Sequence, residues 1–145
     1  MFKSERNSNE NEGSIKELLC EQYLPRVFQY LNYWLNDQEI AEGMTLKAMK
    51  EALVKYGDCR NDEQKLTTGI FKCARKNVLD YFKMNKAKPV LSGLSVQEQE
   101  VISLRLAAEV NNRMIATLLG ISEAKIVPII RQSLGKLRDC MEVPS

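Results

Sequence analysis

The sequence predicts an all-helical protein made of two small helical modules joined by a short linker. Apolar residues recur at three- and four-residue spacing along most of the chain, which is the period of a helix with one buried face. No segment shows the sustained period-two alternation of a β-strand. With 145 residues, 44% of them hydrophobic, the chain is long enough for one ordinary domain or two small helical ones.

Residues 1–13 are rich in Asn, Ser and Glu and contain almost no apolar side chains. Such a segment cannot bury enough apolar surface to fold, so a disordered tail is expected there. Ser14 is suited to cap a first helix that continues to Leu35, with Pro25 as a point where this helix bends or divides.

Two further helices complete the first module. Asp37 is suited to cap the second helix and Gly57 to end it, which gives an antiparallel hairpin with a short turn. Asp62 is suited to cap the third helix, which is expected to end before Pro89. Three amphipathic helices can share one core, so residues 14–85 are assigned to the first module.

The second module is expected to follow a linker over residues 86–93, KAKPVLSG, which contains Pro and Gly and few apolar residues. Residues 94–145 form this module. Its first helix begins at Ser95, because Glu98 three residues later completes a capping box, and runs to about Ala108.

A helix-turn-helix is the most specific local pattern in the second module. A helix over residues 112–119 ends at Gly120, and Ser122 is suited to cap the next helix two residues later. The four- and six-residue spacings of Ala116, Gly120 and Ile126 match this motif, which would make the last helix a DNA-recognition helix. The alternative is an ordinary helical hairpin in a core.

Pro128 complicates the recognition helix. If Ser122 caps that helix, Pro128 lies in its second turn, where its missing N–H and its ring cost about 3 kcal/mol. The helix is therefore expected either to begin nearer Val127 or to bend. The start of this helix also offers no basic contact to DNA at three successive positions, Val127, Pro128 and Ile129. The candidate DNA contacts here are Arg113, Ser122, Glu123, Lys125 and Arg131, with Lys136 as a further phosphate contact; for Arg131 and Lys136, solubility is an equal alternative.

Positive charge is concentrated in the middle of the chain, around the third helix. The formal net charge is only +2, but residues 58–93 contain 8 Lys or Arg against 4 Asp or Glu. Cations interleaved with aromatic rings are what a nucleic-acid backbone and unstacked bases require. The alternative is a solvated helix surface, with Phe71 and Phe82 in the core. The candidate DNA contacts on this helix are Lys72, Arg75, Lys76 and Lys83.

Other classes of function have less support. The four cysteines form no CxxC pair and the chain has no histidine, so reduced thiols, no metal and no cofactor are expected. No glycine-rich phosphate loop or nucleophile elbow is present, so an enzyme is not expected. The polar N-terminus and the lack of a long apolar run favour a cytoplasmic protein without a membrane segment.

The two halves together resemble bacterial sigma-70 family factors of the extracytoplasmic-function type over residues 23–140. The strings YLPRVFQYL, AEGMTLKAMKEAL and IFKCARKNVLDYF are similar to the family's second region, which binds the RNA polymerase clamp and the minus-ten promoter element. The strings LSVQEQEVISLRLAAEV and IATLLGISEAKI are similar to the fourth region, which binds the polymerase flap and the minus-thirty-five element. The resemblance implies that core RNA polymerase and promoter DNA are the partners, with an anti-sigma factor or other regulatory protein as a further one.

Several positions differ from the family's usual residues. The resemblance implies a polymerase-binding site at Glu42, Gly43, Thr45, Leu46 and Lys47. The family commonly has an acidic residue at the position of Gly43, glutamine at that of Leu46 and glutamate at that of Lys47. It also commonly has a tryptophan at the position of Gly69, beside the loop that holds a flipped promoter base.

Three functions follow from these observations. The first is a sigma factor-like protein that binds core RNA polymerase and promoter DNA to direct transcription initiation. The second is a divergent sigma-like regulator that acts mainly through protein–protein contacts. The third is a dimeric helix-turn-helix DNA-binding regulator, because residues 94–140 also resemble the response-regulator type. Between the two candidate DNA surfaces, the basic third helix has the stronger support.

Overall fold

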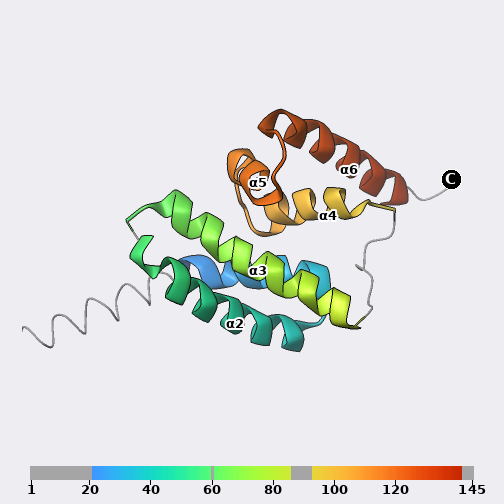
Figure 1. The fold of residues 1–145 in the computed structure, drawn as a ribbon. Helices are drawn as coiled ribbons and strands as arrows, with labels where there is room; N and C mark the ends of the chain where they lie inside the picture. Colours follow the sequence, from blue (N-terminus) through green and yellow to red (C-terminus); the bar gives the residue numbers. More distant parts are fainter. Residues whose placement is uncertain (1–20, 60, 86–92, 142–145) are drawn as a thin grey trace, which may run out of the picture.

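The computed structural model describes residues 21–59, 61–85 and 93–141 (Figure 1). These residues form helices, helical turns and short loops, without a strand, which confirms the predicted all-helical fold. The predicted tail over residues 1–13, the cap at Ser14 and nearly all of the predicted linker lie outside the described residues. None of the described helices combines the length and the apolar character that crossing a membrane requires.

The first half consists of three long helices. The N-terminal helix covers residues 21–35 of the described chain, and Pro25 does not divide it. The caps predicted for the next two helices are confirmed: Asp37 Oδ1 accepts from the N–H of Ile40 at 3.1 Å, and Asp62 Oδ1 accepts from the N–H of Lys65 at 3.2 Å. The helices and the turn between them are α2 (Gln38–Tyr56), the 3-10 turn η1 (Gly57–Cys59) and α3 (Glu63–Asn85).

The second half begins with the predicted capping box. Ser95 Oγ accepts from the N–H of Glu98, and the Glu98 carboxylate accepts from the N–H of Ser95. The helix was expected to remain regular to about Ala108, but its last turn widens into a π-helix. The elements are α4 (Val96–Ile102), the π turn η2 (Ser103–Ala107), α5 (Asn112–Leu119), the 3-10 turn η3 (Glu123–Lys125) and α6 (Ile126–Met141).

The turn between α5 and α6 uses the predicted glycine but not the predicted cap. Gly120 adopts φ +67°, and its N–H donates to the Ala116 carbonyl. The prediction that Ser122 caps the last helix was wrong in part. Ser122 precedes the 3-10 turn η3, and its side chain makes no capping hydrogen bond. Helix α6 begins only at Ile126. Pro128 is thereby the third residue of α6. In that first turn an N–H has no helical partner, so proline removes no helical hydrogen bond.

The two halves pack against each other (Figure 1). Helix α2 lies antiparallel along α3, and α4, α5 and α6 lie above α3 and the N-terminal helix in this view. Most of the buried apolar residues of both halves belong to one apolar cluster, which includes Trp34 and Phe71 from the first half and Leu104 and Ile115 from the second. The second half thus covers part of the first half's apolar surface.

Hydrogen bonds from Trp34 and from Arg26 join the two halves, in addition to a bond between Arg75 and Glu100. The Trp34 Nε1–H donates to Ser103 Oγ at 3.0 Å, and both side chains are buried. The Arg26 Nε–H donates to the carbonyl of Ala108 at 2.8 Å, and its Nη2 donates to that of Glu109 at 3.3 Å. Glu109 has a positive φ of 57°, so Arg26 binds a tight, left-handed bend. Directional bonds of this kind fix how the second half sits on the first.

An ion pair with Glu98 joins the two ends of the second half. Glu98 Oε1 lies 2.8 Å from Lys136 Nζ on α6, and the same oxygen accepts from the Ser95 N–H at 2.8 Å. These bonds hold the pKa of the Glu98 carboxyl below its ordinary value. Lys136, expected as a phosphate contact, therefore serves to hold α6 on α4.

The Glu98–Lys136 pair predicts a pH-dependent stability. Because the folded pKa of Glu98 lies below its unfolded value, the pair stabilises the fold above the unfolded pKa of about 4.3, and this contribution is lost as the pH falls through the folded pKa. Lys136→Met is expected to lower the free energy of unfolding at pH 7 by roughly 0.5–1 kcal/mol. Urea denaturation at a series of pH values measures this difference, which should shrink below a pH of about 4.

Lys125→Met is the matched control, because Lys125 is exposed and forms no ion pair with a described carboxylate. It should change stability little at either pH. A loss in Lys136→Met that stays constant from pH 7 to pH 3 would contradict the assignment to Glu98.

Candidate nucleic-acid interface

Helix α3 separates its apolar and basic residues by helical period. Phe71, Ala74 and Val78 are buried, whereas Lys72, Lys76 and Lys83 are exposed. The three lysines lie four and seven residues apart, which places them on one side of the helix. The predicted core position of Phe71 is confirmed; Phe82 is partly buried against the core.

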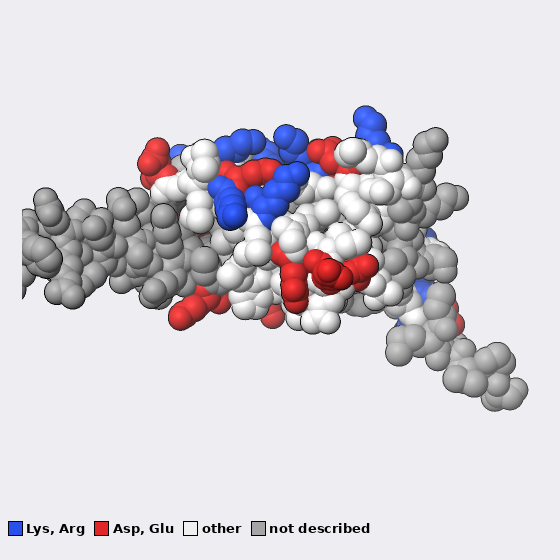
Figure 2. Space-filling view, turned by 90° about the horizontal axis from the view of Figure 1, so that it is seen from below, with Lys and Arg blue, Asp and Glu red and all other residues white. Residues whose placement is uncertain are grey.

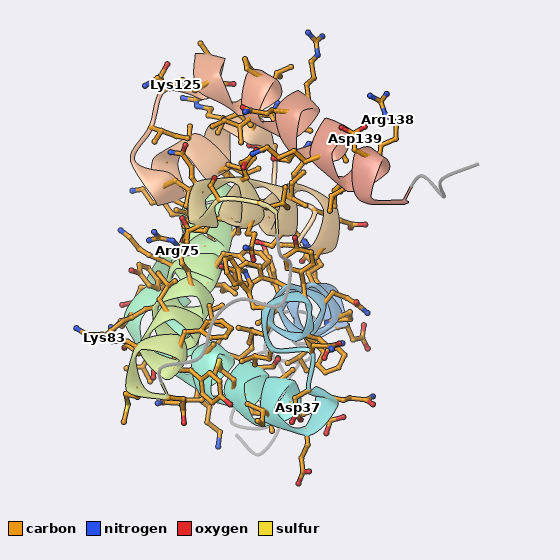
Figure 3. The ribbon with its side chains drawn as sticks, turned by 90° about the vertical axis from the view of Figure 1, so that its right-hand side faces the viewer. Asp37, Arg75, Lys83, Lys125, Arg138 and Asp139 are labelled. Atoms are coloured by element: carbon orange, nitrogen blue, oxygen red, sulfur yellow. The ribbon has the colours of Figure 1, made fainter. Side chains whose placement is uncertain are left out.

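The basic side of α3 faces the same way as the start of α6. Figure 3 shows Arg75 and Lys83 projecting from α3 toward one side of the molecule, with Lys125 on that side above them and Arg138 on the opposite side. Figure 2 shows Lys and Arg side chains gathered along one side of the visible face, with some Asp and Glu side chains among them and a further group of Asp and Glu below. Cations are therefore more numerous on this side of the molecule than the small net charge of +2 alone would indicate.

Arg75 differs from the other predicted contacts on α3. Its Nε lies 2.7 Å from Glu100 Oε1, and the two side chains are 31% and 9% exposed. A carboxylate this buried needs a charged partner, because its desolvation is otherwise uncompensated. Arg75 therefore holds α4 against α3, and this ion pair competes with any contact between Arg75 and a DNA phosphate.

Tyr56, at the end of α2, lies between two cavities on this side of the molecule. The first, of about 380 Å³, is lined by Lys65 and Lys72 and also by Arg113 of α5. The second, of about 390 Å³, shares Tyr56 and Lys72 with the first and is lined further by Lys55 and Lys76, with Asp80 as its one carboxylate among the described residues. Arg113 and Lys72, predicted as contacts on different modules, thus line one cavity.

The ring of Tyr56 explains why position 69, in the middle of α3, is a glycine. A Cβ added at Gly69 would lie 2.5 Å from Cγ of Tyr56 and 2.6 Å and 2.8 Å from Cδ2 and Cδ1. Carbon atoms do not approach this closely, so only glycine fits beneath this ring. The tryptophan that the family resemblance implies at this position is incompatible with the Tyr56 placement. Tyr56 therefore supplies the aromatic ring in this part of the surface.

The predicted contacts at the turn and on α6 are exposed, but they are mixed with apolar side chains. Val127 is 43% exposed and Pro128 is exposed, whereas Ile129 is partly buried against the core. The start of α6 therefore presents apolar surface beside its cations. The exposed predicted contacts in this region are Arg113, Ser122, Glu123, Lys125 and Arg131.

The predicted polymerase-binding residues on α2 divide into two groups. Glu42, Gly43, Leu46 and Lys47 are exposed, and Leu46 is 55% exposed despite being apolar. The predicted polymerase contact at Thr45 does not fit its position, because Thr45 is buried. Its hydroxyl donates to the Ala41 carbonyl at 2.6 Å. Its position on the inner side of α2 follows from the helical period.

A groove of about 460 Å³ lies beside these residues, between α2 and the N-terminal helix. Its apolar walls come from Leu24, Pro25 and Phe28 on one side and Leu46 on the other, and Glu42 lies among the lining residues. The exposed Leu46 is therefore part of a larger apolar surface, which a residue-by-residue reading of α2 does not show.

Cys73 is one of the residues that line the second cavity. It is a free thiol, it is buried, and burial raises its pKa. A raised pKa keeps the thiol protonated near neutral pH and lowers its reactivity. All four cysteines were predicted to be reduced thiols, and Cys73 is the one whose side chain the structure describes as free.

Sequence reasoning did not find Lys55, Tyr56 or Lys65 as site residues. Lys55 and Tyr56 end α2 and Lys65 begins α3, so they belonged to no basic run in the sequence. One signal was available: Gly69 in the middle of an otherwise regular helix indicates close approach by another group. The identity of that group depends on the angle between α2 and α3.

Comparisons of this chain with protein-family models, with curated proteins and with solved structures found no match.

Proposed function

We propose that this chain is a sigma factor-like protein that binds core RNA polymerase and contacts promoter DNA, mainly through the basic side of α3. The resemblance of the sequence to sigma factors is the reason for proposing core RNA polymerase and promoter DNA as the partners. The feature that carries the proposal is the set of exposed cations on one side of the molecule, Lys72, Lys76 and Lys83, extended by Lys55, Lys65 and Arg113.

These cations are suited to phosphates because they are not neutralised within the protein. None of them forms an ion pair with a carboxylate of the described chain. Phosphate binding by such groups releases counterions and is independent of base sequence. The Tyr56 ring between them offers a flat surface for an unstacked base.

The groove between α2 and the N-terminal helix supports the polymerase part of the proposal. It combines apolar walls with exposed polar residues of α2, including Gln38 and Glu42. An apolar centre with a polar rim is typical of a surface that binds another protein. Leu46, whose family counterpart is polar, gives this surface a more apolar centre than the resemblance implies.

Removing one lysine from α3 should weaken DNA binding uniformly across sequences. Lys76→Ala and Lys83→Ala are each expected to lower the slope of log K against log salt concentration by about 1, because each removes one phosphate contact. Fluorescence anisotropy with labelled duplex and single-stranded DNA at several salt concentrations measures both affinity and slope.

Arg138→Ala is the matched control for these variants. Arg138 is 75% exposed, lies on the opposite side of the molecule from Lys83 (Figure 3), and makes only a 3.9 Å contact with Asp139. It should leave the slope unchanged. Equal effects of Arg138→Ala and Lys83→Ala would show that binding follows total charge and not the basic side of α3.

The polymerase part is tested by pull-down with core RNA polymerase. The unchanged protein is expected to associate, and Leu46→Glu is expected to weaken this association by placing a charge in the apolar groove. Failure of the unchanged protein to associate would refute this part whatever the DNA result. Mapping of bound chromosomal sites then identifies the promoters.

A divergent regulator acting mainly through protein contacts is the second candidate. It is favoured by the apolar start of α6, where Val127 is 43% exposed and Pro128 replaces a basic contact, and by the pairing of Arg75 with Glu100. Tight autonomous binding to a defined promoter duplex would exclude it. Association with polymerase without measurable DNA binding would favour it over the first candidate.

A further inference from the structure

The cavity beside Tyr56 is lined by cations from both halves of the protein. Lys65 and Lys72 come from α3, and Arg113 comes from α5 of the second half. Of the described residues that line it, none is a carboxylate, and none of the three cations is ion-paired within the described chain. Like charges around one cavity repel each other, so a bound anion would stabilise their arrangement.

The same cavity has an aromatic wall. The Tyr56 ring is held over the backbone of Gly69, where no Cβ would fit, and Met114 of α5 also lines the cavity. A thioether and an aromatic ring are both suited to contact a planar, polarisable group. The cavity therefore combines a site for negative charge with a site for a flat ring.

The size of the cavity limits the ligand. Its volume of about 380 Å³ lies at the lower end of the range of about 300–1,000 Å³ for pockets that bind small organic ligands. A nucleic-acid duplex cannot enter such a space, whereas a single nucleotide has the required size, charge and ring. Polar groups of Thr68 and Gln64 are also present to bind a sugar or a base edge.

We propose that this cavity is a binding site for a free nucleotide, with its ring against Tyr56 and its phosphates bound by Lys65, Lys72 and Arg113. Because these cations come from α3 and α5, the bound nucleotide connects the two halves and stabilises their packing. This site does not depend on the proposed role in transcription. It would give the protein a response to a small molecule at the contact between its halves.

Isothermal titration calorimetry and thermal unfolding with AMP, ADP, ATP and GTP test the proposal on the full chain. At least one nucleotide is expected to bind and to raise the melting temperature, since a ligand of the folded state shifts unfolding by mass action. Arg113→Ala is expected to weaken binding at least tenfold. The side chain of Arg113 is exposed, so this variant should fold normally.

Two controls separate this site from general attraction between charges. Lys83→Ala removes a cation of α3 that does not line the cavity, and it should change nucleotide affinity less than twofold. Inorganic phosphate and adenosine, each carrying half of the proposed chemistry, should bind at least tenfold more weakly than the best nucleotide. Tyr56→Ala should reduce the preference for nucleotide over phosphate.

Three results would overturn the proposal. These are no binding of any nucleotide, nucleotide binding that Arg113→Ala leaves unchanged, and binding of a single-stranded oligonucleotide without binding of free nucleotides. The last would assign the cavity to a nucleic-acid strand. Loss of polymerase or promoter binding leaves the calorimetric result intact, so failure of the proposed function is distinguishable from failure of this site.

Discussion

Replacing Trp34 with alanine is expected to lower the free energy of unfolding by about 3–5 kcal/mol, the usual cost of deleting a large buried aromatic side chain. Trp34 is 1% exposed and lies in the apolar cluster that both halves share. Its ring contacts those of Tyr33 and Phe82, and its N–H donates to Ser103 in the second half. Urea denaturation followed by circular dichroism measures the loss.

Two comparisons make the Trp34 result specific. Val54→Ala removes an apolar side chain that is 87% exposed on α2, and it should change stability by less than about 0.5 kcal/mol. Trp34→Phe keeps an aromatic ring but leaves the Ser103 hydroxyl without its indole partner, so an intermediate loss is expected. A loss below about 1.5 kcal/mol in Trp34→Ala would contradict the packing of the second half over this side chain.

Trp34 also reports on the contact between the halves in the unchanged protein. It is the only tryptophan in the chain, so the tryptophan fluorescence, excited selectively over the tyrosines, comes from this one indole. Burial between the two halves predicts emission at short wavelength. Emission typical of a water-exposed indole in the folded protein would show that the halves separate in solution.

Replacing Gly69 with alanine is expected to destabilise the protein by about 1–2 kcal/mol, although alanine is the better helix former by roughly 1 kcal/mol. The new Cβ would lie 2.5 Å from the Tyr56 ring, at Cγ near the base of the side chain. The whole ring must therefore move, because no flexible end can shift aside. Its contact with α3 is lost, and both cavities that it lines change shape.

The same substitution in a Tyr56→Ala background should have the opposite sign. Without the ring, the Cβ has space, and the helix propensity of alanine then stabilises α3 by up to about 1 kcal/mol. Four proteins measured by urea denaturation complete this double-mutant cycle. Equal effects of Gly69→Ala in both backgrounds would show that Tyr56 is not packed over Gly69. Gly43→Ala, at an exposed glycine of α2 with an open Cβ position, is the control for propensity alone.

Local features of the fold were predictable because they depend on neighbours in the sequence. The caps at Asp37 and Asp62, the capping box of Ser95 and the left-handed glycine at Gly120 each involve residues within a few positions of one another. The late start of α6 was anticipated for the same reason, since proline restricts its own helix. Ser122 failed as an α-helix cap because η3 intervenes before Ile126.

The candidate site was only partly predictable. The exposed positions of Lys72, Lys76 and Lys83 follow from the helical period of α3, which also places Phe71 in the core. The periodicity does not show which cations acquire partners. Arg75 was grouped with these lysines, yet it pairs with Glu100, 25 residues further along the chain.

By itself, the sequence determined the helical class, most helix ends and the concentration of positive charge on one helix, because periodicity, capping and composition are properties of short segments. The packing of the halves was decided only in the tertiary structure, where Trp34 meets Ser103, Arg26 meets Ala108, and Arg113 comes to line a cavity with Lys65 and Lys72. The two hydrogen bonds join residues 69 and 82 positions apart, and the cavity joins residues of α3 and α5; all three depend on the angles at which helices cross. Those angles result from the fit of many buried side chains together.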